Sequence, residues 1–567
     1  MKMTKLVSLL LALTMLFCLA ACGTGDNNSA SKSPAASQPA ASQPETEAPS
    51  AEPEQPDDTQ EPEEAMYPIV SDDLELSIWG TFKAAITGLQ ESYADCYGFK
   101  RAEERTGVSI EWILMSPPDA NQKFPISIAS GDMPDIYRCF PQWYNNLQDA
   151  CDENIIIDLT DKCPEYAPDY YEMLTSDNAR YLDGIDDNGK IFAIWHYKSA
   201  YSAPEGIAIR QDWLNKLDME IPTTLDEMEA YLEGIKTEFG CTTALFVDNA
   251  MYTGGRYWMA HAFNVGGYNK MDNPDEFMQI DGQVMCSYTQ DGFKQYLLKM
   301  NDWYKKGYIS SDFPSTEMDI VNNAVNIGKI TGGDTGCIWS KASSFADYKD
   351  GADDPDFELV GIGNINAVDG GKTHFSVTGT RAARYGYSIT TACDNWDVAM
   401  KWINFFYTPE GIDLYNYGVE GETFTRDGDK IVWTDLVTSK QGLEEYAATS
   451  VADYYSLYEQ AFSFEDPQRL YAFYDDAMVA AIEAWTNGSD GEYMLPLGVS
   501  MNTEETEAFN KAITEIRTFV GEKIGLYIMG DLDIEAEWND FVAQIEQLGV
   551  QDCIDAKQGA LDRYNKR

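Results

Sequence analysis

The chain has 567 residues and a formal net charge of −54, from 40 Lys and Arg residues against 94 Asp and Glu residues. A surface this acidic repels nucleic-acid phosphates and anionic lipid headgroups, which argues against nucleic-acid binding. The acids are spread along the chain, so solubility alone would also account for them. About 500 residues follow the first 65, which is enough for two or more sizeable hydrophobic cores.

The first 22 residues have the pattern of an export signal. Lys2 and Lys5 precede an apolar run over 6–21 that is too short to span a membrane as a helix. The run ends in Leu-Ala-Ala-Cys22, which resembles a bacterial lipobox, the motif whose cysteine becomes the new N-terminus and carries the lipid. The alternative is a plain secretory signal with an incidental cysteine. We expect a signal peptide at 1–21 and lipidation of Cys22, which would anchor the protein to the outer face of the cytoplasmic membrane.

Residues 22–65 have a composition of their own. After Cys22 the chain consists mainly of Ser, Ala, Pro, Gln and acidic residues, with almost no side chain that could join a core. Burial cannot offset the ordering entropy of such a stretch, so we expect it to be disordered and kept extended by its prolines and carboxylates. We interpret it as an acidic stalk that holds the folded part clear of the lipid, the alternative being a polar tail without a role.

The cysteines do not indicate a disulfide scaffold. Of the 11 cysteines, Cys18 lies in the signal peptide and Cys22 in the lipidation motif. The other nine are odd in number and widely spaced, and no C-x-x-C occurs, so they cannot all pair within one chain. We expect most of them to be small buried apolar residues.

Strand and helix patterns alternate through the first two-thirds of the folded part. Leu74, Leu76 and Ile78 alternate with polar residues, which predicts a strand. TTLDEMEAYLEGIKTEF is the clearest helix, because Thr224 and Glu227 form a capping box and apolar residues then recur at helical spacing. Further strands are expected at 109–115, from Asp135, and at 189–197, 206–214, 242–248 and 335–340.

Helices dominate the later part of the chain. NWDVAMKWINFFYTPEG predicts a helix that stops before Pro409, and EAEWNDFVAQIEQLG predicts one that ends at Gly549. The alternation upstream implies α/β layers with mostly parallel sheets.

Motifs for metal binding or catalysis are missing from the sequence. His196, His261 and His374 do not stand at metal-ligand spacing, and neither H-E-x-x-H nor G-x-S-x-G occurs. No EF-hand register fits 183–195, and GGKT at 370–373 lacks the first glycine of a phosphate loop. We therefore expect no cofactor and no metal-binding residues, and calcium binding stays open. A carboxylate pair for glycoside hydrolysis stays open, because 94 acids guarantee accidental neighbours.

Five stretches carry a resemblance to a known family, namely ASGDMPDI, GKIFAI, GIAIRQDWLNKLDMEIPTTLDEMEAYLEGIK, WINFFYTPEGIDLYNYGVEGETFT and EWNDFVAQIEQLGVQDCIDAKQGALDRYN. In this order, and after a lipobox, they resemble the extracellular solute-binding proteins of family 1, the group that includes maltose-binding protein, over 72–567. The closest similarity is to long Firmicute lipoproteins that feed oligosaccharide ABC importers. The resemblance implies a two-lobe α/β fold of the type II periplasmic-binding-protein kind, with a hinge, a helical C-terminal region and the ligand between the lobes.

The resemblance also implies that the chain crosses between the lobes more than once. We expect the first crossing after GKIFAIWHY and the return near RYGYSITT. Lobe one is then 72–200 plus 384–425, and lobe two is 201–383 plus 426–567.

Aromatic residues make up 13% of the chain, with 13 Trp and 34 Tyr. Sugars present C–H faces that pack on aromatic rings and hydroxyl groups that need Asp, Glu, Asn or Arg partners. Ligands of open α/β sheets bind at the carboxyl ends of strands, and the resemblance places such strand-end loops at the cleft. The candidate ligand-binding residues are Trp79, Tyr137, Arg138, Phe140, Trp195, His196, Tyr252, Arg256, Trp258, Trp339, Glu420 and Glu422. Packing in the core is the alternative for each, or a solvated turn for the two acids.

These observations favour a monomeric, lipid-anchored extracellular binding protein that is not an enzyme. It would capture a carbohydrate ligand, expected to be an oligosaccharide, between its lobes and deliver it to membrane-embedded ABC permease subunits. Two other function classes stay open: a surface glycoside hydrolase, and a receptor for peptides or another polar solute on the same fold.

Overall fold

The computed structural model describes residues 66–70, 74–81, 92–144, 146–198, 205–249, 259–266, 276–316, 324–367, 371–375, 381–440, 443, 448–457, 463–487 and 490–567. The predicted signal peptide, Cys22 and the stalk lie outside these residues, as do Tyr252, Arg256 and Trp258. No helix in the described ranges is long and apolar enough to cross a membrane.

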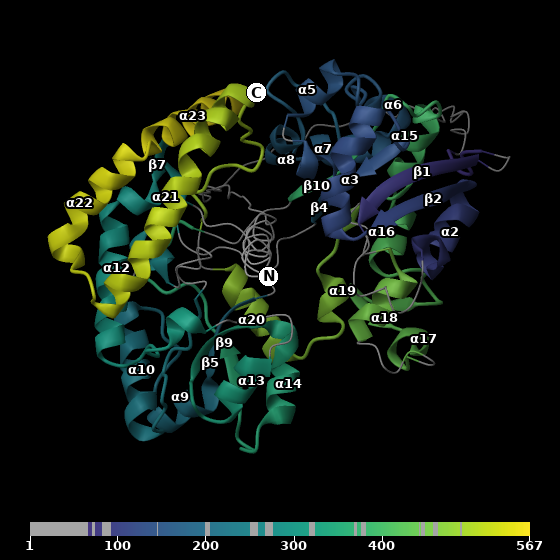
Figure 1. The fold of residues 1–567 in the computed structure, drawn as a ribbon. Coiled ribbons are helices and arrows are strands. Elements are labelled where there is room, and N and C mark those ends of the chain that lie inside the picture. Colours follow the sequence, from purple (N-terminus) through teal and green to yellow (C-terminus); the bar gives the residue numbers. More distant parts are fainter. Residues whose placement is uncertain are drawn as a thin grey trace, which may run out of the picture.

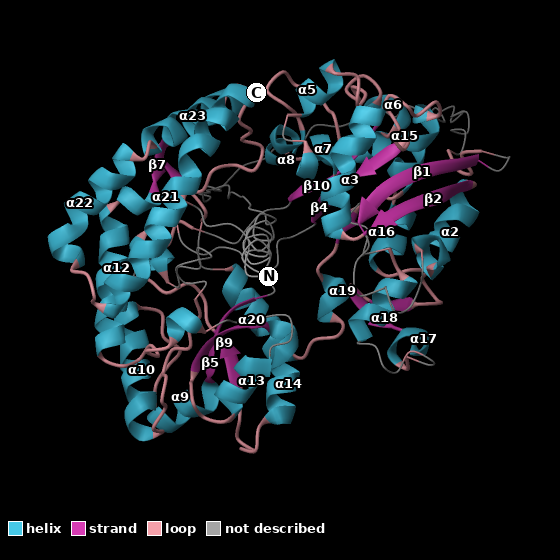
Figure 2. Cartoon of the chain, viewed as in Figure 1, coloured by secondary structure: helices cyan, strands magenta, loops and turns pink. Residues whose placement is uncertain are grey.

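The first lobe is built on a six-stranded sheet in the order β13-β4-β10-β3-β1-β2. Strand β10 alone runs antiparallel to its neighbours, and the other five strands run in one direction. The carboxyl ends of these five strands therefore share one edge of the sheet. In Figure 2, the carboxyl ends of β1 and β2 point toward the second lobe. The strands are β1 (Leu74–Thr81), β2 (Val108–Met115), β3 (Ile136–Arg138), β4 (Ile194–Lys198), β10 (Arg381–Ile389) and β13 (Phe464–Glu465).

Helices cover both faces of this sheet, as the right half of Figure 1 shows. Apolar residues of β1, β4 and β10 form one core with the helices, in which Trp402 and Tyr407 are buried. The main helices are α2 (Tyr97–Thr106), α3 (Pro117–Ser130), α7 (Pro168–Thr175), α8 (Asn178–Gly184), α15 (Trp396–Phe405) and α16 (Pro409–Asn416). α15 ends before Pro409, as the sequence predicts.

The second lobe has a smaller sheet and more helix. Its three strands have the order β8-β5-β9, and the central β5 runs antiparallel to both neighbours. The expectation of mostly parallel sheets is therefore correct for the first lobe and wrong for this one. The strands are β5 (Glu205–Arg210), β8 (Cys337–Lys341) and β9 (Leu359–Gly361). The helices include α9 (Gln211–Leu217), α10 (Leu225–Glu238), α12 (Asp291–Lys305), α13 (Ala324–Thr331), α14 (Phe345–Gly351), α20 (Asp476–Thr486), α21 (Thr503–Met529), α22 (Ile534–Gln547) and α23 (Val550–Tyr564).

Several predicted elements of the second lobe can be checked against these bounds. The capping box of α10 is present, with the Thr224 hydroxyl accepting from the Glu227 amide and the Glu227 carboxylate accepting in return. The strand predicted at 206–214 ends at Arg210, where α9 begins. The strand predicted at 242–248 is reduced to isolated bridges at Leu245. The nine cysteines of the described ranges are free and all but Cys151 are buried, which confirms the expectation of small apolar residues.

The chain crosses between the lobes after β4, before β10 and again between β13 and α20. At the third crossing, β13 pairs with β4 and the segment before it packs against α2. The stretch 426–465, expected in lobe two, therefore lies with the first lobe. It contains β12 (Lys430–Trp433), α17 (Asp435–Thr438) and α18 (Ala448–Tyr455), and β11 (Phe424–Asp427) begins just before it.

A second contact between the lobes lies away from these crossings, where α23 of the second lobe ends beside α8 of the first lobe (Figure 1). The Arg567 side chain is 1% exposed. Its guanidinium donates to the carbonyls of Leu182 and Ile185, each at 2.7 Å, and to Asp187 Oδ1 at 2.7 Å. Arg563 also donates from Nε to Asp187 Oδ2 at 2.6 Å.

The buried carboxylate of Asp183 continues this contact. Its Oδ1 accepts from the Gly498 amide at 2.8 Å and from the Tyr564 hydroxyl at 3.2 Å. Gly498 has no room for a side chain, because a Cβ there would lie 2.8 Å from Asp183 Oδ1. We call the set of Asp183, Asp187, Gly498, Arg563, Tyr564 and Arg567 the interlobe clasp.

Candidate functional site

Four of the candidate residues come together at the carboxyl edge of the first sheet. Trp79 lies two residues before the end of β1, Tyr137 and Arg138 end β3, and Phe140 starts the short helix α4 (Phe140–Trp143). Trp79 is 4% exposed, and Tyr137 and Phe140 are 0% exposed. They share a cluster with Phe124 of α3. The sequence placed these side chains at one edge, and the structure buries most of their rings in a common cluster there.

Two rings packed against this cluster, Trp143 and Tyr144, are partly exposed, and the sequence analysis missed both. Trp143, the last residue of α4, is half-buried. Its indole meets Trp79 edge-on with ring centres 4.8 Å apart and stacks on Phe124 at 5.3 Å. Its Nε1 donates to Asn121 Oδ1 at 2.8 Å. Trp143 could have been predicted from the sequence, because it lies three residues after Phe140 and residues at this spacing share one face of a helix.

Arg138 lies between the ends of β1 and β3. Its side chain is buried, and Nη1 donates to the Thr81 carbonyl at 3.2 Å. The structure thus fixes one positive charge at the carboxyl edge, although little of its surface is accessible.

Trp195 and His196 lie at a crossing between the lobes. Trp195 is buried and donates from Nε1 to the Gly184 carbonyl at 3.2 Å. His196 Nε2 lies 3.2 Å from Glu465 Oε2, which joins β4 to β13. Lys198 Nζ lies 3.3 Å from the other oxygen of Glu465. These contacts hold together the two strands from which the chain leaves the first lobe.

Glu465 carries the strongest electrostatic signal of this crossing. Burial alone would raise the pKa of its carboxyl, but Lys198, His196 and buried Arg469 outweigh that effect and hold the pKa well below its usual range. Glu465 is therefore an anion inside the protein, stabilised by Lys198, by Arg469 and by its hydrogen bond with His196.

The second lobe contributes Trp339 near the end of β8. Trp339 is half-buried, packs against the core of this lobe and pairs in register with Ile207 of β5. Leu245 pairs in parallel with Cys337, so the buried Asp248 comes to the same end of the sheet as Trp339. Asp248 is a polar residue of this edge that the sequence analysis missed. Tyr252, Arg256 and Trp258 lie outside the described residues, and their ligand role stays a prediction.

Glu420 and Glu422 lie apart from the other candidates. Both are exposed on the side of the first lobe that carries α2, which Figure 1 shows far from the second lobe. Glu420 pairs with Arg426. Glu422 accepts from Tyr97 and lies 2.7 Å from Arg101, and these two hydrogen bonds lower the pKa of its carboxyl. The structure gives both acids partners within the first lobe.

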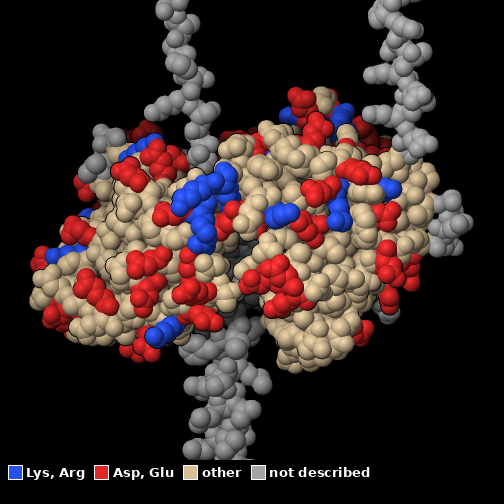
Figure 3. Space-filling model, turned by 90° about the horizontal axis from the view of Figure 1, so that it is seen from above, with Lys and Arg blue, Asp and Glu red and all other residues tan. Residues whose placement is uncertain are grey.

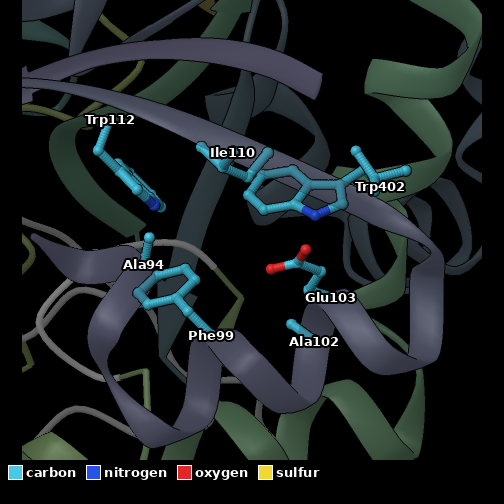
Figure 4. A pocket seen from close by; sticks show the side chains of 8 residues that line it. Ala94, Phe99, Ala102, Glu103, Ile110, Trp112 and Trp402 are labelled. Carbon is cyan, nitrogen blue, oxygen red and sulfur yellow. The ribbon is translucent and has the colours of Figure 1, made fainter. Parts of the chain in front are cut away.

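A small cavity between α2 and β2 is too small to hold a sugar (Figure 4). Its volume is about 10 Å³, which is room for about one water molecule. Apart from Glu103, its lining is apolar, with Phe99, Trp112 and Trp402 among the side chains. It is a packing gap of the first lobe.

One group in the described ranges has the donor atoms for a metal ion. His374, Asp490 and Glu492 place one ligand atom each within 4.8 Å of one another in the second lobe. His374 Nδ1 lies 3.0 Å from Asp490 Oδ1, and the Lys372 ammonium also pairs with Asp490. The lysine already pairs with this carboxylate and the His374 ring lies within hydrogen-bond distance of it, so we interpret the group as a polar network.

Comparison with known proteins agrees with this two-lobe geometry. The chain is 23% identical over 491 residues to the fructooligosaccharide ABC transporter substrate-binding protein FusA of Streptococcus pneumoniae, covering 82% of this chain and 86% of FusA. It is 23% identical over 337 residues to the polygalacturonan/rhamnogalacturonan-binding protein YtcQ of Bacillus subtilis, covering 57% and 62% of the two chains. In the second case the match spans less than two-thirds of the relative.

The fold also matches solved structures. An HMO-binding, ABC-transporter-associated solute-binding protein from Bifidobacterium longum infantis superposes with a TM-score of 0.70 at 18% identity, covering 87% of this chain and all of that one. The two-lobe α/β fold expected from the sequence is thereby confirmed. The family profile described as bacterial extracellular solute-binding protein matches residues 99–417, more than half of the chain. The chain therefore belongs to the bacterial extracellular solute-binding protein family.

Proposed function

We propose that this protein captures an oligosaccharide between its two lobes and hands it to the permease of an ABC importer. The observation that carries the proposal is the aromatic cluster of Trp79, Phe124 and Trp143 at the carboxyl edge that faces the second lobe. Rings at this position suit the C–H faces of sugars. The similarity to FusA over most of both chains supports the same ligand class.

We propose that the ligand is neutral rather than anionic. Figure 3 shows acidic side chains spread over both lobes, with basic side chains in smaller groups among them. The formal charge of −54 adds a repulsive field that disfavours a polyanion such as a galacturonan. A fructooligosaccharide or another uncharged saccharide does not meet this repulsion.

The role proposed here is binding and delivery, without catalysis. Lobe closure would bring Trp339 and Asp248 of the second lobe toward the carboxyl edge of the first lobe, with Tyr252, Arg256 and Trp258 as further proposed contacts. Lipidation of Cys22 would keep the domain at the outer face of the membrane, next to its permease. A monomer suffices for this task.

The test is isothermal titration of the Cys22→Ser protein against a defined panel. The panel contains kestose, nystose, maltotriose, xylotriose, lacto-N-tetraose, trigalacturonate and tri-alanine. We expect saturable binding of at least one neutral saccharide and no binding of the peptide. Binding of tri-alanine alone would contradict the proposal, and tight binding of trigalacturonate alone would contradict its neutral-ligand part. Release of labelled monosaccharide in the same mixtures would indicate a glycoside hydrolase instead.

Lipid anchoring has a separate test. In cells, Cys22→Ser is expected to leave the protein unlipidated and move it from the membrane fraction to the medium or the soluble fraction. The Cys18→Ser variant is the matched control, because Cys18 lies inside the apolar run and is removed with the signal. Tight membrane retention of Cys22→Ser would show that the lipobox interpretation is wrong.

A further inference from the structure

We infer that Trp143 is the ring on which one sugar unit of the ligand stacks, and that Asn121 fixes the orientation of that ring. This inference rests on the proposed function and assigns it to one side chain. Trp143 ends α4, which follows β3, and the neighbouring strand β1 runs parallel to β3 and points toward the second lobe (Figure 2).

Exposure separates Trp143 from its partners in the cluster. Trp79, Phe124 and Tyr137 are 4%, 5% and 0% exposed, so none of them offers a face to a ligand in this arrangement. Trp143 and Tyr144 are both half-buried against the same cluster, but the Tyr144 ring stacks on Phe140 and its hydroxyl donates to Glu153 Oε2 at 2.8 Å. Trp143 is the one of the two whose ring contacts both Trp79 and Phe124, so we assign the ligand contact to its exposed part.

The ring is held on three sides. Phe124 lies along the indole, Trp79 meets it edge-on, and Asn121 Oδ1 accepts from Nε1 at 2.8 Å. A surface tryptophan without such support would lose rotamer freedom when a ligand bound. Trp143 has already lost that freedom on folding, so the indole is preorganised for stacking.

Asn121 adds hydrogen-bond donors next to the ring. Its Oδ1 is occupied by the indole N–H, and within the described residues its NH₂ group has no acceptor. The side chain is exposed at the start of α3, so these donors face water or a ligand. A ring face beside amide donors is the combination that a saccharide requires, because its C–H face and its hydroxyl groups must be satisfied together.

The experiment measures affinity and folding of three variants with the panel saccharide that wild type binds most tightly. Trp143→Ala is expected to lower affinity about tenfold, because a stacked ring contributes about 0.5–1.5 kcal/mol beyond its buried area and 1.4 kcal/mol is tenfold. Trp143→Phe keeps a ring and loses the bond to Asn121, so we expect a smaller loss of about threefold.

The matched control is Trp396→Ala. Trp396 is also half-buried in the first lobe, but it packs against Tyr166 and Lys162 at the start of α15. The saccharide affinity of Trp396→Ala should stay within about twofold of wild type. If wild type binds a saccharide and Trp143→Ala binds it equally well, the inference is wrong and the proposed function stands. If wild type binds no saccharide of the panel, both fail.

A second measurement covers the case in which Trp143→Ala folds poorly. The protein is labelled with 5-fluorotryptophan, and the ¹⁹F resonance of Trp143 is assigned by its absence in Trp143→Phe. Saturating saccharide should shift this resonance and leave the Trp396 resonance in place. An unshifted Trp143 resonance in a saccharide-saturated sample would overturn the inference.

Discussion

The two lobes differ in how their hydrophobic cores are built. In the first lobe, five strands of one direction bring their carboxyl ends to one edge, and helices pack on the sheet. In the second lobe the sheet has three strands, and most of the core lies between α10, α12, α21 and α22. The comparison shows that a sheet of three strands is sufficient in the second lobe, because long helices supply most of the buried apolar area. It also predicts that the lobes respond differently to damage.

The largest effect is expected in the helical core. Trp303 of α12 is fully buried and donates from Nε1 to Glu229 Oε2 at 2.9 Å. Trp303→Ala should lower the free energy of unfolding by about 3–5 kcal/mol. Differential scanning calorimetry measures it, with Trp402→Ala in the first lobe as the counterpart. If the lobes unfold as one unit, either variant lowers a single transition. Two transitions, of which each variant moves one, would show that the lobes are independent.

Glu465→Gln tests the crossing that separates the two cores. Loss of this buried anion removes the carboxylate that pairs with Lys198 and His196, while Arg469 keeps its ion pair with Asp453, and we expect a cost of about 3 kcal/mol at pH 7. Urea unfolding at fixed pH measures it. Glu229→Gln is the counterpart in the second lobe, where Lys299 and Lys306 pair with a half-buried carboxylate whose pKa they and Trp303 lower to about 2 against the effect of burial.

The pH dependence of Glu465 follows from the direction of its pKa. The folded protein holds the pKa of Glu465 below the ordinary value of 4.5, so its stabilising effect is complete above about pH 4.5 and is lost as the pH falls toward the folded value. Wild type should therefore lose stability between pH 5 and pH 3 more steeply than Glu465→Gln. Parallel curves for the two proteins would contradict this assignment.

Arg567→Gln tests whether the interlobe clasp couples the lobes. The variant removes charged hydrogen bonds to Leu182, Ile185 and Asp187, and we expect it to cost about 2 kcal/mol. Calorimetry should show a broadened or split transition. Arg517→Gln is the control, because Arg517 pairs with Glu276 inside the second lobe. A transition in Arg567→Gln that is as narrow as that of the control would show that the clasp does not couple the lobes.

The smallest effect is expected at Glu422. Its ion pair with Arg101 is on the surface, so Glu422→Gln should change the unfolding free energy by about 0.2–1 kcal/mol. We also expect saccharide affinity within about twofold of wild type, measured by titration, because Glu422 lies beside α2. Glu410→Gln, which breaks the neighbouring pair with Arg105, is the control. A tenfold loss of saccharide affinity in Glu422→Gln, but not in Glu410→Gln, would show that Glu422 belongs to the ligand site.

Local signals in the sequence predicted local structure well. The capping box of Thr224 and Glu227 and the alternation of Leu74, Leu76 and Ile78 are read from neighbours along the chain, and both elements are present. The strand predicted at 206–214 was wrong beyond Arg210, because this buried arginine pairs with Asp212 of the next turn, which starts α9. In a continuous strand, Arg210 and Asp212 would lie on the same face, but the Arg210 guanidinium could not donate to both Asp212 oxygens as it does here.

Long-range partners set the rest of the site and could not be predicted from one sequence. His196 is a plausible ligand contact until Glu465, 269 residues later, is placed beside it. Trp79 and Trp143 look equal in the sequence, and only the packing of Phe124 and Tyr137 decides which ring is buried. Strand ends predicted that Trp79, Tyr137 and Phe140 lie at one edge of the first sheet, whereas the accessibility of each ring depends on tertiary packing.

The interlobe clasp also restricts how the molecule can open. Two rigid bodies that are joined at two separate places keep one free rotation, about the line through both joints. Here one joint is the group of crossings beside β4 and β13, and the other is the contact of Arg567 with the turn after α8. While both hold, the lobes can open and close only by rotating about that line and cannot move apart as a whole. A saccharide would then enter from the side of this axis, and the length of chain admitted would depend on the angle of the rotation.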